Sequence, residues 1–222
     1  MRRATVGSVL VLVVSSFAFD ASASEPRTHD GWYVRMGLGA SLMHVASRNE
    51  WPAGVAEYSG VAPGLALEFA LGGTPLPGLV LGGALWGEQG TLDAEIQYED
   101  YTRGKSSRRE RFEPAIGGLG PFVDWYPWPQ RGLHFQAAIA SGGVVVNDAH
   151  CNIDQGGNIC TLSPRTRSGL MFGLGTGFEI WTGREWGLGG LLRVSHIYAS
   201  NEDDSGHYEI WAPSLLVTAT HH

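Results

Sequence analysis

The segment from Leu170 to Ile180 reads LMFGLGTGFEI and places a large apolar side chain or threonine at every second position. The positions between carry mainly glycine, with Met171 and Glu179 as the exceptions. Successive side chains of a β-strand point to opposite faces, so a two-residue period over this length predicts a strand rather than a helix. The strand has one broad apolar face and one face of small residues.

Seven further segments show the same alternation, which gives eight strands in total. They are residues 32–42, 65–71, 79–88, 118–125, 133–140, 186–195 and 211–220. Two of these strands are less regular, because Leu191 and Leu216 interrupt the small or polar face. The repeated period predicts an all-β chain.

Charged side chains fall on the face opposite the large apolar residues. The charged or amide members of this face are Arg35, Glu68, Glu88, Asp124, His134, Gln136, Glu179 and Arg193. A soluble sandwich would fill its polar face with Lys, Glu and Thr, whereas here Gly, Ala and Ser dominate it. An apolar outer band around a crowded polar lumen is typical of a transmembrane β-barrel, so these residues are expected to form a charge network in the lumen.

The connections alternate in length. Residues 72–78, 127–132 and 182–185 are short and rich in Gly or Pro, whereas 45–63, 89–117, 147–168 and 199–207 are longer and polar. Outer-membrane barrels have short periplasmic turns and longer extracellular loops. The pattern predicts an eight-stranded antiparallel up-and-down transmembrane β-barrel in the outer membrane.

Composition excludes other classes. Glycine supplies 32 of 222 residues and charged residues only 17%, and past residue 19 no apolar run is long enough for a transmembrane helix. The net charge is −7, and the only basic run lies between Arg103 and Arg111, so nucleic-acid binding is not expected. That run is either a solvated loop or a contact for anionic lipid head groups.

The first 23 residues are typical of a cleaved secretory signal peptide, since Arg2 and Arg3 precede an apolar stretch and residues 21–23 read ASA. The barrel domain is then residues 24–222. In an exported protein, Cys151 and Cys160 are expected to form a disulfide that closes a loop. The alternative is a metal site with His150, Asp148 and Asp154; we expect no metal and no cofactor.

Tryptophans gather at strand ends beside the short connections. The five residues expected to form an aromatic girdle at the periplasmic interface are Trp32, Trp125, Trp128, Trp181 and Trp186. The residues available for a second, outer girdle are Trp86, Tyr198, Tyr208 and Trp211. The alternative interpretation is that all of these are ordinary core aromatics.

Three segments resemble the small eight-stranded outer-membrane β-barrel proteins of Gram-negative bacteria, the OmpA/OmpX type. They are residues 29–39 (HDGWYVRMGLG), the glycine-rich strand 169–181 and the closing strand 211–222. The resemblance covers essentially the whole chain after the signal peptide. It implies the same barrel fold, a cell-envelope location, and outer-membrane lipid, lipopolysaccharide and the outer-membrane assembly machinery as partners of a monomeric protein.

A barrel of eight strands is about wide enough for its own side chains to fill. We expect Arg35 and Arg193 to pair with the lumen carboxylates and plug the barrel, because buried charges are costly unless paired. Four carboxylates face two arginines, so either His134 carries a proton or one acid is neutral. A narrow, porin-like ion path through the same residues is the alternative.

We expect a structural or envelope-interaction role and no enzyme activity, with the surface loops as interaction sites. An alternative is a barrel enzyme acting on lipid A, as the lipid A deacylases do, because residues 195–201 carry histidine and serine near Glu202 and Glu209. His196 and Ser200 are four positions apart, about 13 Å in a strand, which is too far for proton transfer.

The loop 89–117 has an acidic and a basic half, and its segments 95–98 and 109–112 both alternate, so they are able to pair as an extended hairpin. A soluble lipocalin-like barrel is the remaining alternative for the fold. It would require Leu65, Leu67 and Phe69 to point inward and Glu68 outward.

Overall fold

The computed structural model describes residues 28–154, 157–200 and 206–222, so the expected signal peptide lies outside the described residues. The described chain forms ten strands and, within these residues, no helix long and apolar enough to cross a membrane. The strands are β1 (Gly31–Trp51), β2 (Gly54–Leu76), β3 (Leu79–Gly90), β4 (Leu92–Asp100), β5 (Gly104–Phe112), β6 (Ala115–Trp125), β7 (Leu133–Asp154), β8 (Gly157–Trp181), β9 (Trp186–Ser200) and β10 (Gly206–His221).

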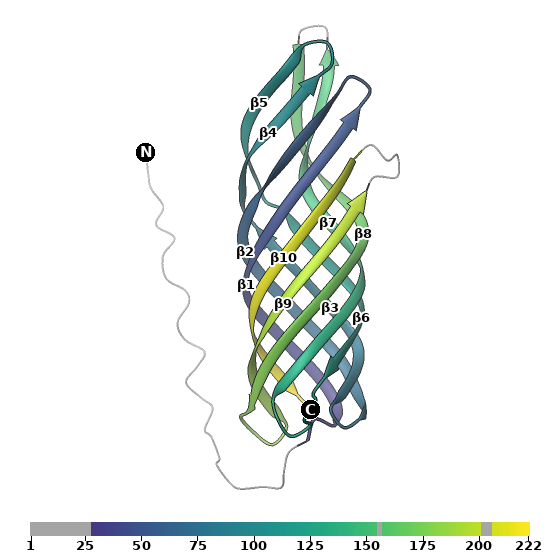
Figure 1. Ribbon diagram of the computed structural model, residues 1–222, viewed down its shortest axis with the longest axis vertical. Coiled ribbons are helices and arrows are strands. Elements are labelled where there is room, and N and C mark those ends of the chain that lie inside the picture. Colours follow the sequence, from purple (N-terminus) through teal and green to yellow (C-terminus); the bar gives the residue numbers. More distant parts are fainter. Residues whose placement is uncertain (1–27, 155–156, 201–205) are drawn as a thin grey trace, which may run out of the picture.

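Eight of these strands close into an antiparallel ring. The order around it is β1, β10, β9, β8, β7, β6, β3 and β2, and β2 pairs again with β1. The strands are strongly tilted, and the C-terminus lies at the end of the barrel where the short turns gather (Figure 1). The expected eight-stranded up-and-down barrel is therefore confirmed.

Strands β4 and β5 extend the ring beyond its rim. Gln89 of β3 pairs with Ala115 of β6, and three residues further along the chain Leu92 of β4 pairs with Phe112 of β5. The register is therefore unchanged from one pair of strands to the next. Strands β3 and β4 form one arm of a long hairpin, and β5 and β6 form the other, with a short interruption in each arm. The chain reverses after Asp100, where Gly104 adopts a φ of 91° that favours glycine. The hypothesis that the two halves of segment 89–117 pair with each other is confirmed.

The strands are much longer than the sequence suggested. β2 has 23 residues and β8 has 25, whereas a tilted strand needs about 9–11 residues to cross a membrane. The segments 45–63, 89–117 and 147–168 are long connections, as expected, but most of their residues continue the antiparallel ladder instead of forming irregular loops. Between β1 and β2 only residues 52–53 lie outside the strands.

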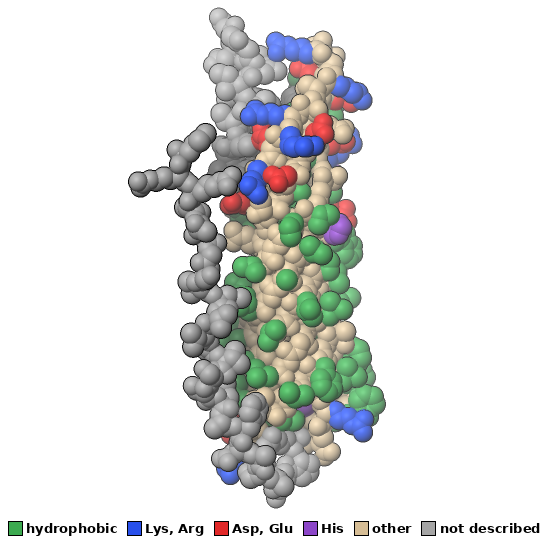
Figure 2. Space-filling model, turned by 90° about the vertical axis from the view of Figure 1, so that its left-hand side faces the viewer, with side chains coloured by type: hydrophobic (Ala, Val, Ile, Leu, Met, Phe, Trp, Pro, Cys, Tyr) green, Lys and Arg blue, Asp and Glu red, His purple; other side chains and the backbone are tan. Residues whose placement is uncertain are grey.

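The hydrophobic pattern inverts along these long strands. In β3, Leu81 and Leu85 are exposed on the outer wall, whereas Leu92 and Ile96 of the continuing β4 are buried inside and Glu95 faces out. Figure 2 shows the two zones on one face, with apolar side chains over the lower part and Lys, Arg, Asp and Glu gathered above. The lower zone suits lipid outside the barrel, and the upper zone suits water.

The interior is correspondingly layered. A polar layer lies inside the apolar belt, and a mainly apolar layer, which also holds the buried Arg167 over the ring of Tyr208, fills the upper barrel. The main members of the upper layer are Met43, Tyr58, Leu92, Ile96, Phe112, Ile116, Val144, Met171, Ile197, Tyr208 and Ile210. Within it, the rings of Tyr58 and Phe112 stack at 4.9 Å. The expectation of a polar lumen thus holds for only part of the barrel's height.

The lipocalin-like alternative is wrong for the lower zone. Leu65 and Leu67 are 63% and 60% exposed, whereas Glu68, the residue after Leu67, is only 5% exposed. A cavity-lining arrangement would need the reverse. The apolar belt therefore faces outward around the ring, as a membrane-spanning barrel requires.

Four of the five expected girdle residues, Trp32, Trp125, Trp128 and Trp186, are exposed near the short turns. Trp181 differs, because its side chain occupies the inward register and its ring lies 4.9 Å from that of His29. Of the residues considered for the outer girdle, Tyr198 and Trp211 are exposed, but Trp86 and Tyr208 are buried inside the barrel. Those two are interior aromatics.

Candidate functional site

The polar layer of the lumen is centred on Glu68 of β2. Arg35 of β1 donates from Nε to Glu68 Oε1 at 2.8 Å, and Arg193 of β9 pairs with Glu68 Oε2 from the other side. All three side chains are almost fully buried. One carboxylate therefore bridges two guanidinium groups that come from different parts of the ring.

Each arginine has a second carboxylate partner. Arg193 Nη2 lies 3.2 Å from Glu88 Oε1 of β3, and the Ser195 hydroxyl donates to the same oxygen at 2.9 Å. Arg35 pairs through Nη1 with Asp124 of β6. The network thus joins strands on opposite sides of the ring, and its two guanidinium groups face three carboxylates.

Asp124 collects further donors. The Tyr33 hydroxyl donates to Asp124 Oδ2 at 3.0 Å, and His134 Nδ1 lies 2.7 Å from Oδ1. Gln136 donates from Nε2 to Glu68 at 3.3 Å. Because buried charges are stabilised only when paired and hydrogen-bonded, these contacts explain how a narrow barrel holds so many polar groups.

Glu179 does not join the arginines, so its expected place in that network is wrong. Its Oε1 lies 2.8 Å from His29 Nε2 and 3.0 Å from His222 Nε2, at the end of the barrel with the short turns. The residue lies two positions from the end of β8, and this separates it from the arginine layer. Glu179, His29 and His222 form a second buried cluster, called here the mouth cluster.

Sequence reasoning missed four contributors to these clusters, namely Tyr33, Ser195, His29 and His222. Tyr33 and Ser195 occupy inward positions of their strands, so alternation alone was sufficient to find them. His29 and His222 lie just outside β1 and β10. These two histidines could have been predicted to lie close together, because an even number of strands brings the first and last residues of the barrel domain to the same side of the membrane.

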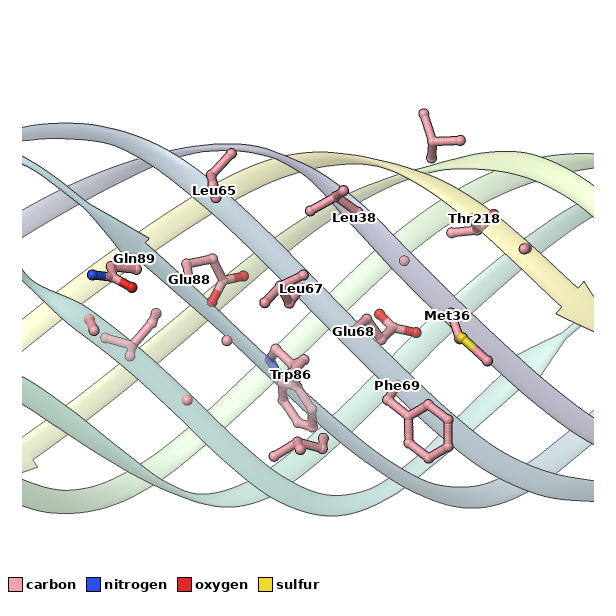
Figure 3. A pocket seen from close by; sticks show the side chains of 18 of the residues that line it. Met36, Leu38, Leu65, Leu67, Glu68, Phe69, Trp86, Glu88, Gln89 and Thr218 are labelled. Atoms are coloured by element: carbon pink, nitrogen blue, oxygen red, sulfur yellow. The ribbon is translucent and has the colours of Figure 1, made fainter. Parts of the chain in front are cut away.

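The outer wall carries a shallow groove of about 870 Å³ within the apolar belt. Figure 3 shows it from close by, with Leu65, Leu67 and Phe69 of β2 beside Trp86 of β3. Gly87 of β3 and Gly117 of β6 pair directly with each other, and because neither has a side chain, the outer surface is recessed at this point. The groove lies in the lipid-facing zone and so is not an aqueous binding site.

The residues considered for a lipid A deacylase are not brought together. β9 continues as a strand through Ser200, so no turn closes the gap between Ser200 and His196. His196 instead lies 3.4 Å from Glu209, with its ring 4.1 Å from Trp211. Ser195 faces the lumen, and Glu202 lies outside the described residues. No His–Ser pair in the described part of this segment has catalytic geometry.

The backbone places Cys151 directly opposite Cys160 in the β7–β8 ladder. Opposed residues of an antiparallel pair have Cα atoms about 4.5–5.5 Å apart, within the range that a disulfide needs. The side chains of both cysteines lie outside the described residues, as do those of Asp148, His150 and Asp154. The disulfide therefore stays a prediction.

The closed ring, the outward apolar belt and the buried polar layer together define an eight-stranded transmembrane β-barrel of the outer-membrane type. Comparisons with protein-family models and with curated proteins found no match. Solved structures with this fold do match.

The outer membrane protein OprG from Pseudomonas aeruginosa has a TM-score of 0.52 at 9% identity, over 90% of this chain and 100% of that one. The outer membrane protease OmpT from Escherichia coli has a TM-score of 0.46 at 8% identity, over 92% and 99%. Neisserial surface protein A has a TM-score of 0.41 at 16% identity, over 86% and 96%.

The likeness to OprG establishes a shared fold. It agrees with the resemblance to small Gram-negative outer-membrane barrels that the sequence indicates, and with the expected location in the outer membrane.

The bridging role of Glu68 predicts a large stability difference between two glutamate variants. Glu68→Gln leaves Arg35 and Arg193 buried without their shared charge and should lower the free energy of unfolding by about 3–5 kcal/mol. Glu57→Gln removes a half-exposed partner of Arg48 and should lower the stability far less, because exposed ion pairs contribute little. Guanidinium unfolding of both variants in detergent micelles measures the difference, and equal stabilities would contradict the bridging role.

Proposed function

We propose that this protein is a non-conducting, non-catalytic outer-membrane barrel that holds a rigid β-structured extension above the membrane as a surface for envelope interactions. The observation that carries the proposal is the inversion of the hydrophobic pattern within single strands. The outward side chains of one strand are apolar in its lower part, where they suit lipid, and polar or charged in its upper part, where they suit water. Such an arrangement favours a platform rather than a channel.

Two layers support a closed lumen. The polar layer around Glu68 is shielded from bulk solvent, since Arg35 and Asp124 are both 0% exposed. Above it lies the apolar layer, which includes Leu92 and Phe112 and in which a hydrated ion would lose its water without compensation. A solute or ion path would have to cross both layers.

The extension is stiffened by charge pairs on its outer face. Three opposite-charge pairs lie directly across β4 and β5, and they are Asp93 with Arg111, Glu95 with Arg109 and Glu99 with Lys105. Each cross-strand pair of this kind contributes about 0.2–1 kcal/mol. The basic run is therefore matched by the acidic strand beside it, which favours a self-paired hairpin over a flexible cationic loop.

The turn of this hairpin is ordered as well. Asp100 accepts hydrogen bonds from the Thr102 hydroxyl at 2.6 Å and from the Thr102 and Arg103 backbone amides. The Thr102 hydroxyl and these amides hold the pKa of Asp100 below its usual range. Side chains fix this turn locally, as aspartate commonly does.

The partners that fit this arrangement are the lipids of the outer membrane. Acyl chains would contact the apolar belt, and the charged groups of lipopolysaccharide would lie level with exposed side chains just above it, such as Arg48 and Glu57. The barrel acts as a monomer inserted by the outer-membrane assembly machinery. The extension, rather than the lumen, is the interaction site.

Planar-bilayer recording tests the closed lumen. The protein, refolded and shown to insert by heat-modifiable gel mobility, should give no discrete openings, and Arg193→Ala should also be silent because the apolar layer still closes the barrel. A porin added to the same bilayer provides the positive control. Discrete openings in the unmodified protein whose amplitude changes in Arg193→Ala would overturn the closed-lumen proposal.

Trypsin treatment of intact cells tests the rigid extension. Lys105, Arg109 and Arg111 lie within β5 and should resist cleavage because a protease needs an unpaired, extended segment, whereas Arg103 in the turn should be cut. Arg109→Glu places like charges opposite each other and should expose the remaining sites of β5. Mass spectrometry of the fragments reads out the sites.

The matched control is Arg184→Glu, at the opposite end of the barrel, which should leave the cleavage pattern unchanged. Rapid cleavage throughout β5 in the unmodified protein would show a flexible loop and contradict the proposal.

A further inference from the structure

The mouth cluster has the composition of a metal site. His29 is fully buried, and the side chains of Glu179 and His222 are only 3% and 2% exposed. One ligand atom from each residue lies within 4.8 Å of the others. Two imidazole nitrogens and a carboxylate oxygen therefore converge in a space that water scarcely reaches.

The backbone fixes both histidines in place. The His29 amide donates to the Pro129 carbonyl at 3.0 Å, and the Gly78 amide donates to the His29 carbonyl. The His222 amide donates to the Glu185 carbonyl at 2.9 Å. The three side chains of the cluster thus come from separate segments that the turns of the barrel hold together.

Hydrogen bonding orients the His29 ring. Its Nδ1 lies 2.6 Å from the Pro129 carbonyl oxygen, which can only accept, so Nδ1 carries the hydrogen. Its Nε2 is hydrogen-bonded to Glu179 Oε1 at 2.8 Å, so a proton lies between these two atoms. Histidines that bind metals commonly donate their other N–H to a backbone carbonyl in this way, and the contact fixes the tautomer.

The remaining polar atoms of the cluster are incompletely used. Both histidines point Nε2 at one oxygen, Glu179 Oε1, while Glu179 Oε2 and His222 Nδ1 are buried and have no hydrogen-bond partner among the described residues. Buried polar groups normally have hydrogen-bond partners. A carboxylate oxygen without one, beside two imidazole rings, therefore indicates a position for a bound ligand. A cation between the three side chains would displace the protons held in these two contacts and bind the freed nitrogen and oxygen lone pairs.

We propose that His29, Glu179 and His222 bind a divalent transition metal ion with the ligand preferences of Zn²⁺. Zinc takes three protein ligands of this type and leaves a fourth position for another donor. Imidazole nitrogens favour zinc and its neighbours over Mg²⁺ and Ca²⁺, which prefer all-oxygen sites. Ligand atoms around a tetrahedral zinc lie about 3.3 Å apart. Binding therefore requires the 2.8 and 3.0 Å contacts to open by a few tenths of an ångström and the two histidine nitrogens, now within 4.8 Å of each other, to come to the same spacing.

The aromatic surroundings suit a rigid site. The ring of Tyr126 stacks on His29 at 3.8 Å, and the ring of Trp181 lies 4.9 Å from it. The metal would join the approach to β1, the end of β8 and the end of β10. Because β1 and β10 pair to close the ring, the ion clamps the closure of the barrel at this end.

Isothermal titration of the detergent-folded protein with Zn²⁺, after treatment with EDTA, tests the site. One ion should bind per chain, and the midpoint of thermal unfolding should rise by about 5–10 °C at 100-fold excess over the dissociation constant. His222→Gln and Glu179→Gln should each weaken binding more than about tenfold, since loss of an outer-shell partner alone costs about 10–100-fold.

His221→Gln is the matched control, because this neighbouring histidine contacts Glu185 rather than the mouth cluster and its loss should leave binding unchanged. If Glu179→Gln fails to fold, the metal site is tested by two other measurements. These are zinc binding by His222→Gln, whose substitution directly follows the last strand, and the zinc-induced rise in the unfolding temperature of the unmodified protein. The absence of one-to-one binding, or binding that survives in His222→Gln, would overturn the proposal.

Discussion

The carboxylate of Glu68, shared between Arg35 and Arg193, is the interaction on which the barrel interior depends. An eight-stranded barrel is too narrow to hold isolated charges in water-filled space, and unpaired buried charges cost several kcal/mol each. Glu88 and Asp124 extend the bridge to β3 and β6, so the network links the walls of the ring from inside. The charged side chains on the inner face are tolerated because this network pairs them with one another.

The inversion of hydrophobicity along the strands follows from the same geometry. Where lipid surrounds the barrel, the apolar residues must face out and the polar residues must pair inside. Where water surrounds it, the outer face carries ion pairs such as Asp93 with Arg111, and the interior closes around Leu92, Ile96 and Phe112. A continuous hydrogen-bonded ladder passes through both zones, which explains how the extension stays rigid outside the membrane.

Alternation was sufficient to predict the fold, the eight strands of the ring and the inward position of residues such as Glu68 and Arg193. Strand lengths were not predictable in the same way, because the period persists beyond the membrane while the identity of the apolar face changes, and that change was interpreted as loop. Trp86 and Tyr208 were misplaced for a related reason, since aromatic residues near strand ends suit both a girdle and an interior. The mouth cluster required closure of the ring in three dimensions, which brings His29 and His222 to Glu179 from distant parts of the chain.

Residue-by-residue accessibility along one hairpin tests the central claim most directly. Single cysteines at Leu67, Leu85, Glu57 and Glu95, in a background with Cys151 and Cys160 replaced by serine, are spin-labelled in a lipid bilayer and exposed to molecular oxygen or to a water-soluble nickel complex. The account predicts that oxygen dominates relaxation at positions 67 and 85, and that the nickel complex dominates at positions 57 and 95. Strong relaxation by the nickel complex at position 67, or a lipid-like response at position 95, would contradict an inversion of the pattern within continuous strands.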